Sequence, residues 1–209
     1  MARYCMKAFL ASSPNLNKAQ TDELLRLIGK EKADRALVIT AAVVPYGLNP
    51  RPDWVDKQLE PLQKICNELV ETTLEDGDFV PEDVDGYDFV FVSGGNTFYL
   101  AYRLQETEWG QKLTEYINNG GVYSGSSAGS IVLMDNIEHF SPADDPAKAP
   151  RVCSGLSLIK EAIIPHADSE KYGELMRGIA DSYRDDGYEI ISLDDDKVFV
   201  IDGEEKKIV

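Results

Sequence analysis

The sequence predicts a single α/β domain, residues 1–209, built on a largely parallel sheet with helices on both faces. Short apolar runs alternate along the chain with segments of helical period, the order of elements found in sheets joined by helical crossovers. Residues 6–12 and 36–44 are largely apolar, as strands covered on both faces are. No repeat or linker divides the 209 residues, a length that suits one sizeable domain.

The first half of the chain is expected to hold three strands and two helices. Residues 18–30 place Leu24, Leu25, Leu27 and Ile28 at helical spacing on one stripe, with acidic residues near the positive end of that helix. The same spacing extends a second helix over residues 53–74. The strands are expected over residues 6–12, 36–44 and 87–93.

The second half continues the alternation and ends in a hairpin. Helical patterning up to Leu104 and over 109–118 stops at Asn119-Gly120-Gly121, a typical helix stop. The remaining elements are expected to be a strand over 121–124, a helix opening at 130–134, a surface loop over 137–150, a strand over 159–165, a helix over 171–184, a strand over 188–192 and a hairpin of 198–202 with 206–209.

Charge and composition favour a cytoplasmic protein and argue against two classes of partner. The net charge of −16 would repel phosphate backbones and anionic lipid surfaces, so nucleic acid and membranes are not expected as partners. No apolar run reaches the length of a membrane span, and the first ten residues resemble a strand, not a signal peptide. Three scattered cysteines, Cys5, Cys66 and Cys153, form no CxxC pair and suit a reducing compartment.

The strongest functional signal is the segment Gly125-Ser126-Ser127-Ala128-Gly129. A nucleophile elbow requires a strand, a tight turn and a helix, with small residues around the nucleophile because strand and helix pack closely there. All of these are expected around Ser127, which would stand at a helix N-terminus where free N–H groups favour negative charge. The pattern therefore predicts Ser127 as a nucleophile, with the N–H of Ala128 as an oxyanion donor.

A second glycine pair, Gly94-Gly95, ends the preceding strand and is followed by Asn96 and Thr97. Sites in open parallel sheets form outside the carboxyl ends of strands, so both glycine segments are expected to face one crevice. Gly95 is then a second oxyanion donor, and Asn96 or Thr97 is expected to hold substrate. Asn96 also fits the N-cap of the next helix, a role compatible with the first.

A serine nucleophile needs a base, and the chain contains two histidines. His166 ends an apolar strand, where the crevice is expected, whereas His139 lies in the expected surface loop. We therefore predict His166 as the base.

The orienting carboxylate is left open by the residues themselves. Asp144 and Asp145 follow the nucleophile in the loop, and Asp194, Asp195 and Asp196 follow the strand over 188–192. The triple Asp could also bind a metal, but no histidine or cysteine clusters with it, so neither a metal nor another cofactor is expected.

Taken together, Ser93-Gly94-Gly95-Asn96-Thr97-Phe98, the GSSAG segment and Pro165-His166 resemble peptidase E, the family of aspartyl dipeptidases that also includes the cyanophycinases. The resemblance runs from the first strand to the C-terminal hairpin. It implies an intracellular serine peptidase with Ser127 as nucleophile, His166 as base, Gly95 and Ala128 as oxyanion hole, and Asp195 or Asp144 as the acid. The implied fold also resembles class I glutamine amidotransferases, whose elbow carries cysteine where this chain has Ser127.

Substrate specificity is the point where the sequence departs from that family. Members that select an N-terminal aspartate use arginines in the helix after the histidine, and this chain keeps Arg177 and Arg184 in different surroundings. Arg177 is the expected ligand of an acidic side chain, which would make dipeptides with N-terminal Asp the substrates. A non-catalytic protein that binds a small ligand or peptide in the same crevice is the alternative.

Overall fold

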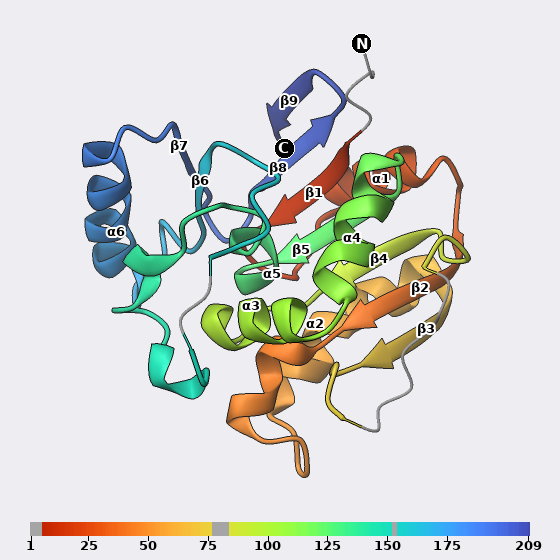
Figure 1. Ribbon diagram of the computed structural model, residues 1–209. Coiled ribbons are helices and arrows are strands. Elements are labelled where there is room, and N and C mark those ends of the chain that lie inside the picture. The colour runs from red at the N-terminus through yellow and green to blue at the C-terminus, as the bar shows by residue number, and fades with distance from the viewer. Residues whose placement is uncertain (1–5, 77–83, 152–153) are drawn as a thin grey trace.

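The computed structural model describes residues 6–76, 84–151 and 154–209. Within these residues seven strands form one sheet, in the order β3-β2-β4-β5-β1-β8-β9 (Figure 1). The first five strands in that order are mutually parallel, and the C-terminal hairpin continues the sheet, with β8 antiparallel to β1 and β9 antiparallel to β8. The largely parallel sheet and the hairpin are as predicted. The strands are β1 (Lys7–Ala11), β2 (Ala33–Ile39), β3 (Cys66–Thr72), β4 (Phe89–Val92), β5 (Val122–Ser126), β8 (Val198–Asp202) and β9 (Glu205–Ile208).

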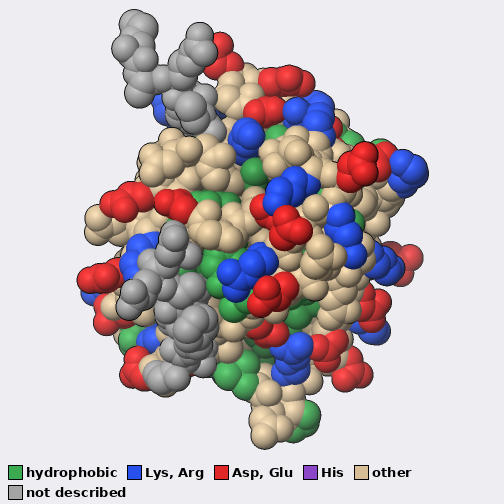
Figure 2. Space-filling view, turned by 90° about the vertical axis from the view of Figure 1, so that its right-hand side faces the viewer, with side chains coloured by type: hydrophobic (Ala, Val, Ile, Leu, Met, Phe, Trp, Pro, Cys, Tyr) green, Lys and Arg blue, Asp and Glu red, His purple; other side chains and the backbone are tan. Residues whose placement is uncertain are grey.

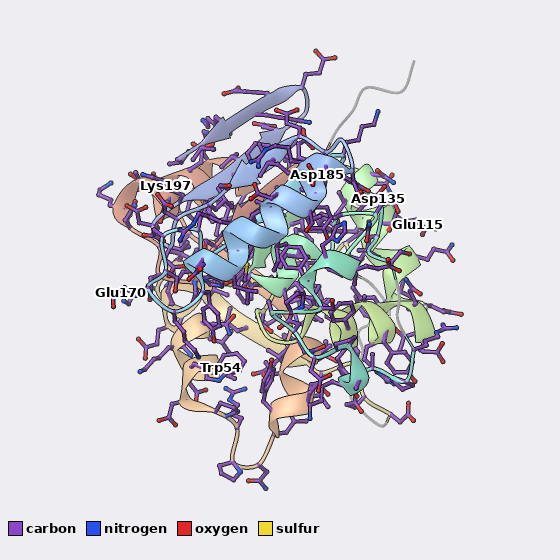
Figure 3. The ribbon with its side chains drawn as sticks, turned by 90° about the vertical axis from the view of Figure 1, so that its left-hand side faces the viewer. Trp54, Glu115, Asp135, Glu170, Asp185 and Lys197 are labelled. Carbon is purple, nitrogen blue, oxygen red and sulfur yellow. The ribbon has the colours of Figure 1, made fainter. Side chains whose placement is uncertain are left out.

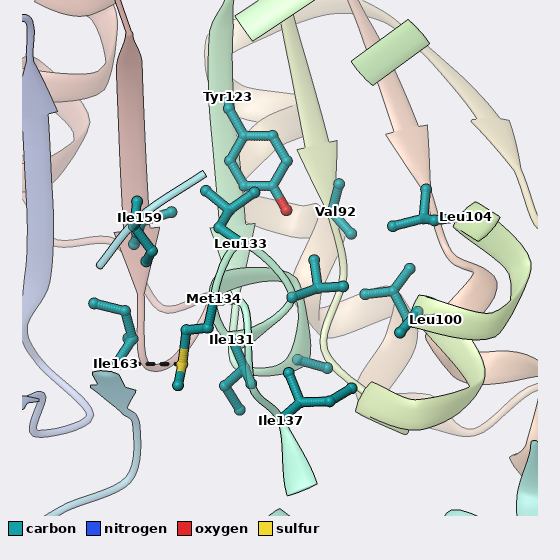
Figure 4. Close-up of a cluster of buried hydrophobic side chains, with 14 of the residues drawn as sticks. Val92, Leu100, Leu104, Tyr123, Ile131, Leu133, Met134, Ile137, Ile159 and Ile163 are labelled. Atoms are coloured by element: carbon teal, nitrogen blue, oxygen red, sulfur yellow. Dashed lines mark hydrogen bonds between the residues drawn. The ribbon is translucent and has the colours of Figure 1, made fainter. Parts of the chain in front are cut away.

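Helices cover both faces of this sheet, as predicted. On one face pack α1 (Lys18–Ile28) and α2 (Asp53–Ile65), and on the other pack α3 (Thr97–Glu106), α4 (Trp109–Asn118) and the short α5 (Ala128–Ile131) (Figure 1). Alternate residues of each strand enter opposite cores: in β4, Phe89 and Phe91 face α1 and α2, whereas Val90 and Val92 face α3 and α5. Figure 4 shows part of the second core, where Val92, Leu100 and Ile131 lie together.

A smaller unit lies beside the carboxyl ends of the main strands. Strands β6 (Ala162–Ile164) and β7 (Ile190–Ser192) pair in parallel as a separate two-stranded sheet, next to α6 (Gly173–Asp185) (Figure 1). The backbone N–H of Ile163 lies 3.4 Å from the sulfur of Met134, a contact drawn in Figure 4. Both strands were predicted, and their separation from the main sheet brings the loops that follow them toward the end of β5.

Two predicted boundaries were wrong. The helix expected over residues 53–74 ends at Ile65, because Cys66–Thr72 pairs with β2 as the half-exposed edge strand β3. The strand expected over residues 36–44 ends at Ile39 and gives way to a 3-10 helix, η1 (Ala41–Tyr46), packed against α3. In both places the apolar spacing indicates burial, and burial alone does not separate a strand from a helical segment.

The remaining elements and the surface complete the description. The loop expected over residues 137–150 contains two single 3-10 turns, η2 (Glu138–Phe140) and η3 (Pro146–Lys148). Cys66 is buried, and burial raises the pKa of its thiol, whereas Cys5 and Cys153 lie outside the described residues. On the face seen in Figure 2, Lys and Arg side chains lie among Asp and Glu side chains. No helix in the described ranges is long and apolar enough to cross a membrane.

Candidate active site

Ser127 occupies a strained turn between β5 and α5. Its backbone has φ 49° and ψ −110°, a conformation that residues with a side chain rarely adopt. The turn is held because the N–H of Ser127 donates to the carbonyl of Ala11 over 3.0 Å, while the N–H of Ile131 donates back to the carbonyl of Ser127. This strand–turn–helix geometry is the one expected of a nucleophile elbow.

Close backbone contacts require glycine at positions 125 and 129 of the elbow. A Cβ on Gly125 would lie 2.5 Å from the carbonyl oxygen of Gly129, and a Cβ on Gly129 would lie 2.1 Å from that of Val92. Neither contact is possible without moving backbone. The buried hydroxyl of Tyr123 donates to the carbonyl of Gly129 and fixes the turn further.

The structure brings three of the predicted residues into one hydrogen-bonded chain. Nε2 of His166 lies 3.0 Å from Oγ of Ser127, and Nδ1 of the same ring lies 2.6 Å from Oδ1 of Asp195. Ser127 follows β5, His166 follows β6 and Asp195 follows β7, so the carboxyl ends of strands from both sheets meet here. The ring and the carboxylate are partly exposed, which leaves the serine side open to a substrate.

Ser12 belongs to the same network and was not singled out in the sequence. Its fully buried hydroxyl accepts the backbone N–H of His166 over 2.7 Å and donates to Oδ1 of Asp195 over 3.0 Å. Asp168 acts one step further out, because its Oδ1 accepts the backbone N–H of Asp195 over 2.9 Å. Only the position of Ser12 at the carboxyl end of the first predicted strand could have drawn attention to it.

The alternative residues for base and acid, His139, Asp144 and Asp145, have other hydrogen-bond partners than Ser127 and His166. His139 pairs with Asp186 over 2.7 Å, on the turn that packs against α6. Asp145 caps η3 by accepting the N–H of Ala147. Asp144 accepts the N–H of Thr97 over 2.9 Å, and burial raises the pKa of its carboxyl, against the opposing effects of Thr97 and His166.

The backbone N–H groups of Gly95 and Ala128 are the two that were predicted as oxyanion donors. Within the described residues, neither N–H donates a hydrogen bond. Gly95 has φ 144°, and a Cβ there would lie 2.3 Å from the carbonyl oxygen of Ala42, so only glycine fits. The neighbouring N–H of Gly94 donates to Oε1 of Gln58 over 2.8 Å, which holds the loop in place.

Asn96 does not match its predicted substrate-binding role. Its side chain is 1% exposed, accepts the N–H of Tyr99 as the N-cap of α3, and donates to the carbonyl of Asp145. Both ends of the amide are thus paired within the protein. Its capping role, predicted alongside, is the one found.

The network opens into a cavity of about 430 Å³. Its walls are mainly aromatic and aliphatic, with Ser127, His166 and Asp144 among the polar groups. The lining residues are Ser12, Pro14, Tyr46, Trp54, Gln58, Gly94, Gly95, Ser126, Ser127, Ile131, Phe140, Ala143, Asp144, His166, Tyr172 and Met176.

Arg177 does not reach this cavity, contrary to the prediction. Met176 lines the cavity, and the next residue on a helix is rotated by about 100°, so Arg177 is directed to solvent. Its guanidinium instead lies beside Gly173, one turn back along α6. Figure 3 views this side of the molecule, with Trp54 of α2 below the N-terminal end of α6.

Fold and site together define an α/β protein with a serine-bearing elbow at the carboxyl edge of a parallel sheet. The model of peptidase family S51 matches residues 8–209, and the chain belongs to that family. The resemblance to peptidase E drawn from the motifs is thereby confirmed.

Relatives with similar sequences are named as peptidases. An uncharacterized peptidase of Listeria innocua serovar 6a is 30% identical over 129 residues, which is 61% of this chain and 61% of that protein. Peptidase E of Nostoc sp. strain PCC 7120 is 39% identical over 77 residues, or 37% of this chain and 31% of its own length. The chain therefore matches less than two thirds of the length of these relatives.

Solved structures share the fold. A candidate peptidase E protein from Listeria monocytogenes EGD-e superposes with a TM-score of 0.79 at 21% identity, covering 98% of both chains. A peptidase from an acI-B1 actinobacterium superposes with a TM-score of 0.72 at 19% identity, covering 99% of this chain and 89% of the other.

Proposed function

We propose that the protein is a serine peptidase that cleaves short peptides through an acyl-enzyme on Ser127. The observation that carries this proposal is the chain from Ser127 through His166 to Asp195, with contacts of 3.0 and 2.6 Å, on a strained elbow. Membership of peptidase family S51 supports the same reaction class.

The geometry suits each step of acyl transfer. Nε2 of His166 accepts the proton of Ser127 as Oγ attacks the peptide carbonyl, and Asp195 keeps the other ring proton on Nδ1 and stabilises the imidazolium. The N–H groups of Gly95 and Ala128 then receive the oxyanion. His166 returns the proton to the leaving amine, and water attacks the acyl-enzyme by the reverse path.

The cavity supports a small substrate. Its volume of about 430 Å³ lies in the range of small-molecule sites, so it suits a short peptide. A preference for N-terminal Asp has no comparable support, because the arginine predicted to select it, Arg177, lies outside the cavity.

The test is labelling by a fluorophosphonate probe, which reacts with activated serines, combined with turnover of a dipeptide library. The wild type should label, and Ser127→Ala should abolish labelling and lower turnover by several orders of magnitude. Ser126→Ala is the matched control and should keep most of both. Equal losses in the two variants, with a changed fold, would remove the assignment of Ser127 as the nucleophile. A wild type that binds dipeptides but neither cleaves them nor is labelled by the probe would indicate a binding protein.

A further inference from the structure

Asp144 is a charged group of the cavity that the proposed reaction does not use. Its carboxylate lines the same space as Ser127, while the imidazole of His166 already has Asp195 as its partner. One oxygen, Oδ2, accepts the N–H of Thr97, at the positive end of α3. Since burial raises the pKa of this carboxyl, keeping it ionised costs free energy that an apolar residue would not.

The cavity offers no cation to a substrate that is itself acidic. Among its lining residues, all within the described ranges, there is no Lys or Arg. Lys171 has its Nζ 4.6 Å from the ring centre of the lining residue Tyr172, but Lys171 itself does not line the cavity. An acidic side chain would therefore be desolvated next to Asp144 with no Lys or Arg of the lining to balance its charge.

The walls favour an apolar or aromatic side chain instead. Ile131, Phe140 and Met176 form a buried part of the wall, and Tyr46 and Trp54 stand at the rim, 50% and 38% exposed, with their rings 5.7 Å apart. When a ligand covers exposed aromatic side chains at a cavity mouth, their apolar surface is removed from water, which favours binding.

We infer that the cavity binds the N-terminal residue of a peptide whose free α-ammonium faces Asp144 and whose side chain is uncharged and apolar. This deepens the proposed function, on which its catalytic part rests. A carboxylate is the complement of an ammonium group, and the charge-assisted hydrogen bond between them is among the stronger ones in proteins. Asp144 is then the residue that selects a free amino terminus, and the wall of Ile131, Phe140 and Met176 selects its side chain.

The test compares matched substrates on the wild type and on Asp144→Asn. The variant keeps an oxygen that can accept the N–H of Thr97 and removes only the charge. The substrates are Phe-Ala, its analogue 3-phenylpropionyl-Ala, which lacks only the amino group, and the isosteric pair Asn-Ala and Asp-Ala. In the wild type kcat/KM should be roughly ten- to a hundredfold higher for Phe-Ala than for the analogue. That ratio should fall to near one in Asp144→Asn, and it should persist in the matched control Asp145→Asn.

Two results would overturn the inference. One is a wild type that cleaves Phe-Ala and its desamino analogue equally well, and the other is a preference for Asp-Ala over Asn-Ala. The calorimetric affinity of Ser127→Ala for Phe-Ala and for 3-phenylpropionyl-Ala gives the same comparison without turnover. If Ser127→Ala binds the two ligands with a tenfold difference in affinity and the wild type is not labelled by the fluorophosphonate, the ammonium site is retained and the serine mechanism is rejected. If the two affinities are equal and the wild type is labelled, the serine mechanism is retained and the ammonium site is rejected.

Discussion

The hydroxyl of Ser12 accepts the backbone N–H of His166 over 2.7 Å and so ties the end of β1 to the loop after β6. His166 has φ 58°, an uncommon conformation for a residue with a side chain, which must be held by its surroundings. The same hydroxyl donates to Asp195, so one buried group holds both His166 and Asp195. We expect Ser12 to act as a positioning residue, since the hydrogen bonds of its hydroxyl go to His166 and Asp195.

Replacing Ser12 should lower catalysis more than binding. Ser12→Ala removes one hydrogen bond to a charged carboxylate and leaves the N–H of His166 without its partner. We expect kcat to fall roughly tenfold to a hundredfold, with KM little changed, as steady-state kinetics would measure. The rate of fluorophosphonate labelling should fall in parallel, because it reports the activation of Ser127.

Ser130→Ala provides the matched control for this experiment. The hydroxyl of Ser130 is equally buried and donates to the carbonyl of Ala11 over 2.8 Å, without touching the imidazole. Ser130→Ala should lower the free energy of unfolding by about 0.5–1.5 kcal/mol, a loss similar to that in Ser12→Ala, while its kcat stays within a few-fold of the wild type. Parallel losses of kcat in both variants would reduce Ser12 to a structural role.

Asp195 should prove to be the acid of the triad. Asp195→Asn keeps the shape of the side chain but favours the wrong imidazole tautomer, so kcat should fall by roughly a hundredfold to ten-thousandfold. We expect a loss of kcat near the hundredfold end of this range, because the Asp195 side chain is 46% exposed and water can replace part of its effect. A nearly unchanged kcat, together with a large loss in Asp145→Asn, would assign the role to the other loop.

Replacing the two histidines should have different effects on turnover and labelling. His166→Ala should abolish turnover and labelling, whereas His139→Ala removes an exposed pair with Asp186 and should cost at most about 1 kcal/mol of stability. Turnover of the His139 variant should stay near that of the wild type. Loss of labelling in the His139 variant with an intact fold would mean that the crevice lies elsewhere.

Asp144 should lower stability in a pH-dependent way. Because burial raises the pKa of its carboxyl, the folded protein holds the proton more tightly than the unfolded chain. The cost of ionising it is absent below about pH 4, the unfolded value, and present in full above the raised pKa. Asp144→Asn should therefore melt at a higher temperature than the wild type at pH 8, and the difference should shrink as the pH falls through the raised pKa toward about 4, the unfolded value. Thermal scans at several pH values would measure it; a variant that melts lower at pH 8 would show that the carboxylate stabilises its loop.

Local sequence was sufficient for the elbow and for most elements. Gly125 reflects a contact within one strand–turn–helix unit, because a Cβ there would meet the carbonyl of Gly129. Gly129 instead reflects a tertiary contact with Val92 of the neighbouring strand β4, although its small size was already part of the motif. The period of α1 and the apolar run of β4 likewise predict their structures, since side-chain spacing alone decides which face is buried. His166 was predicted from the same kind of evidence, its place at the end of a strand.

The edge of the sheet and the choice among distant partners were decided by the tertiary structure. Cys66–Thr72 continues a helical spacing, but pairing with β2 gives its backbone groups partners in a strand. Asp195 and Asp144 are both acids at loop positions, and only the separate β6–β7 sheet brings Asp195 to within 2.6 Å of the imidazole. Arg177 is one position from the cavity-lining Met176 in sequence yet faces solvent, because a single step along a helix turns the side chain by about 100°. Sequence thus determined which residue types stand at strand ends, whereas the packing of separate strands and helices determined which of them meet.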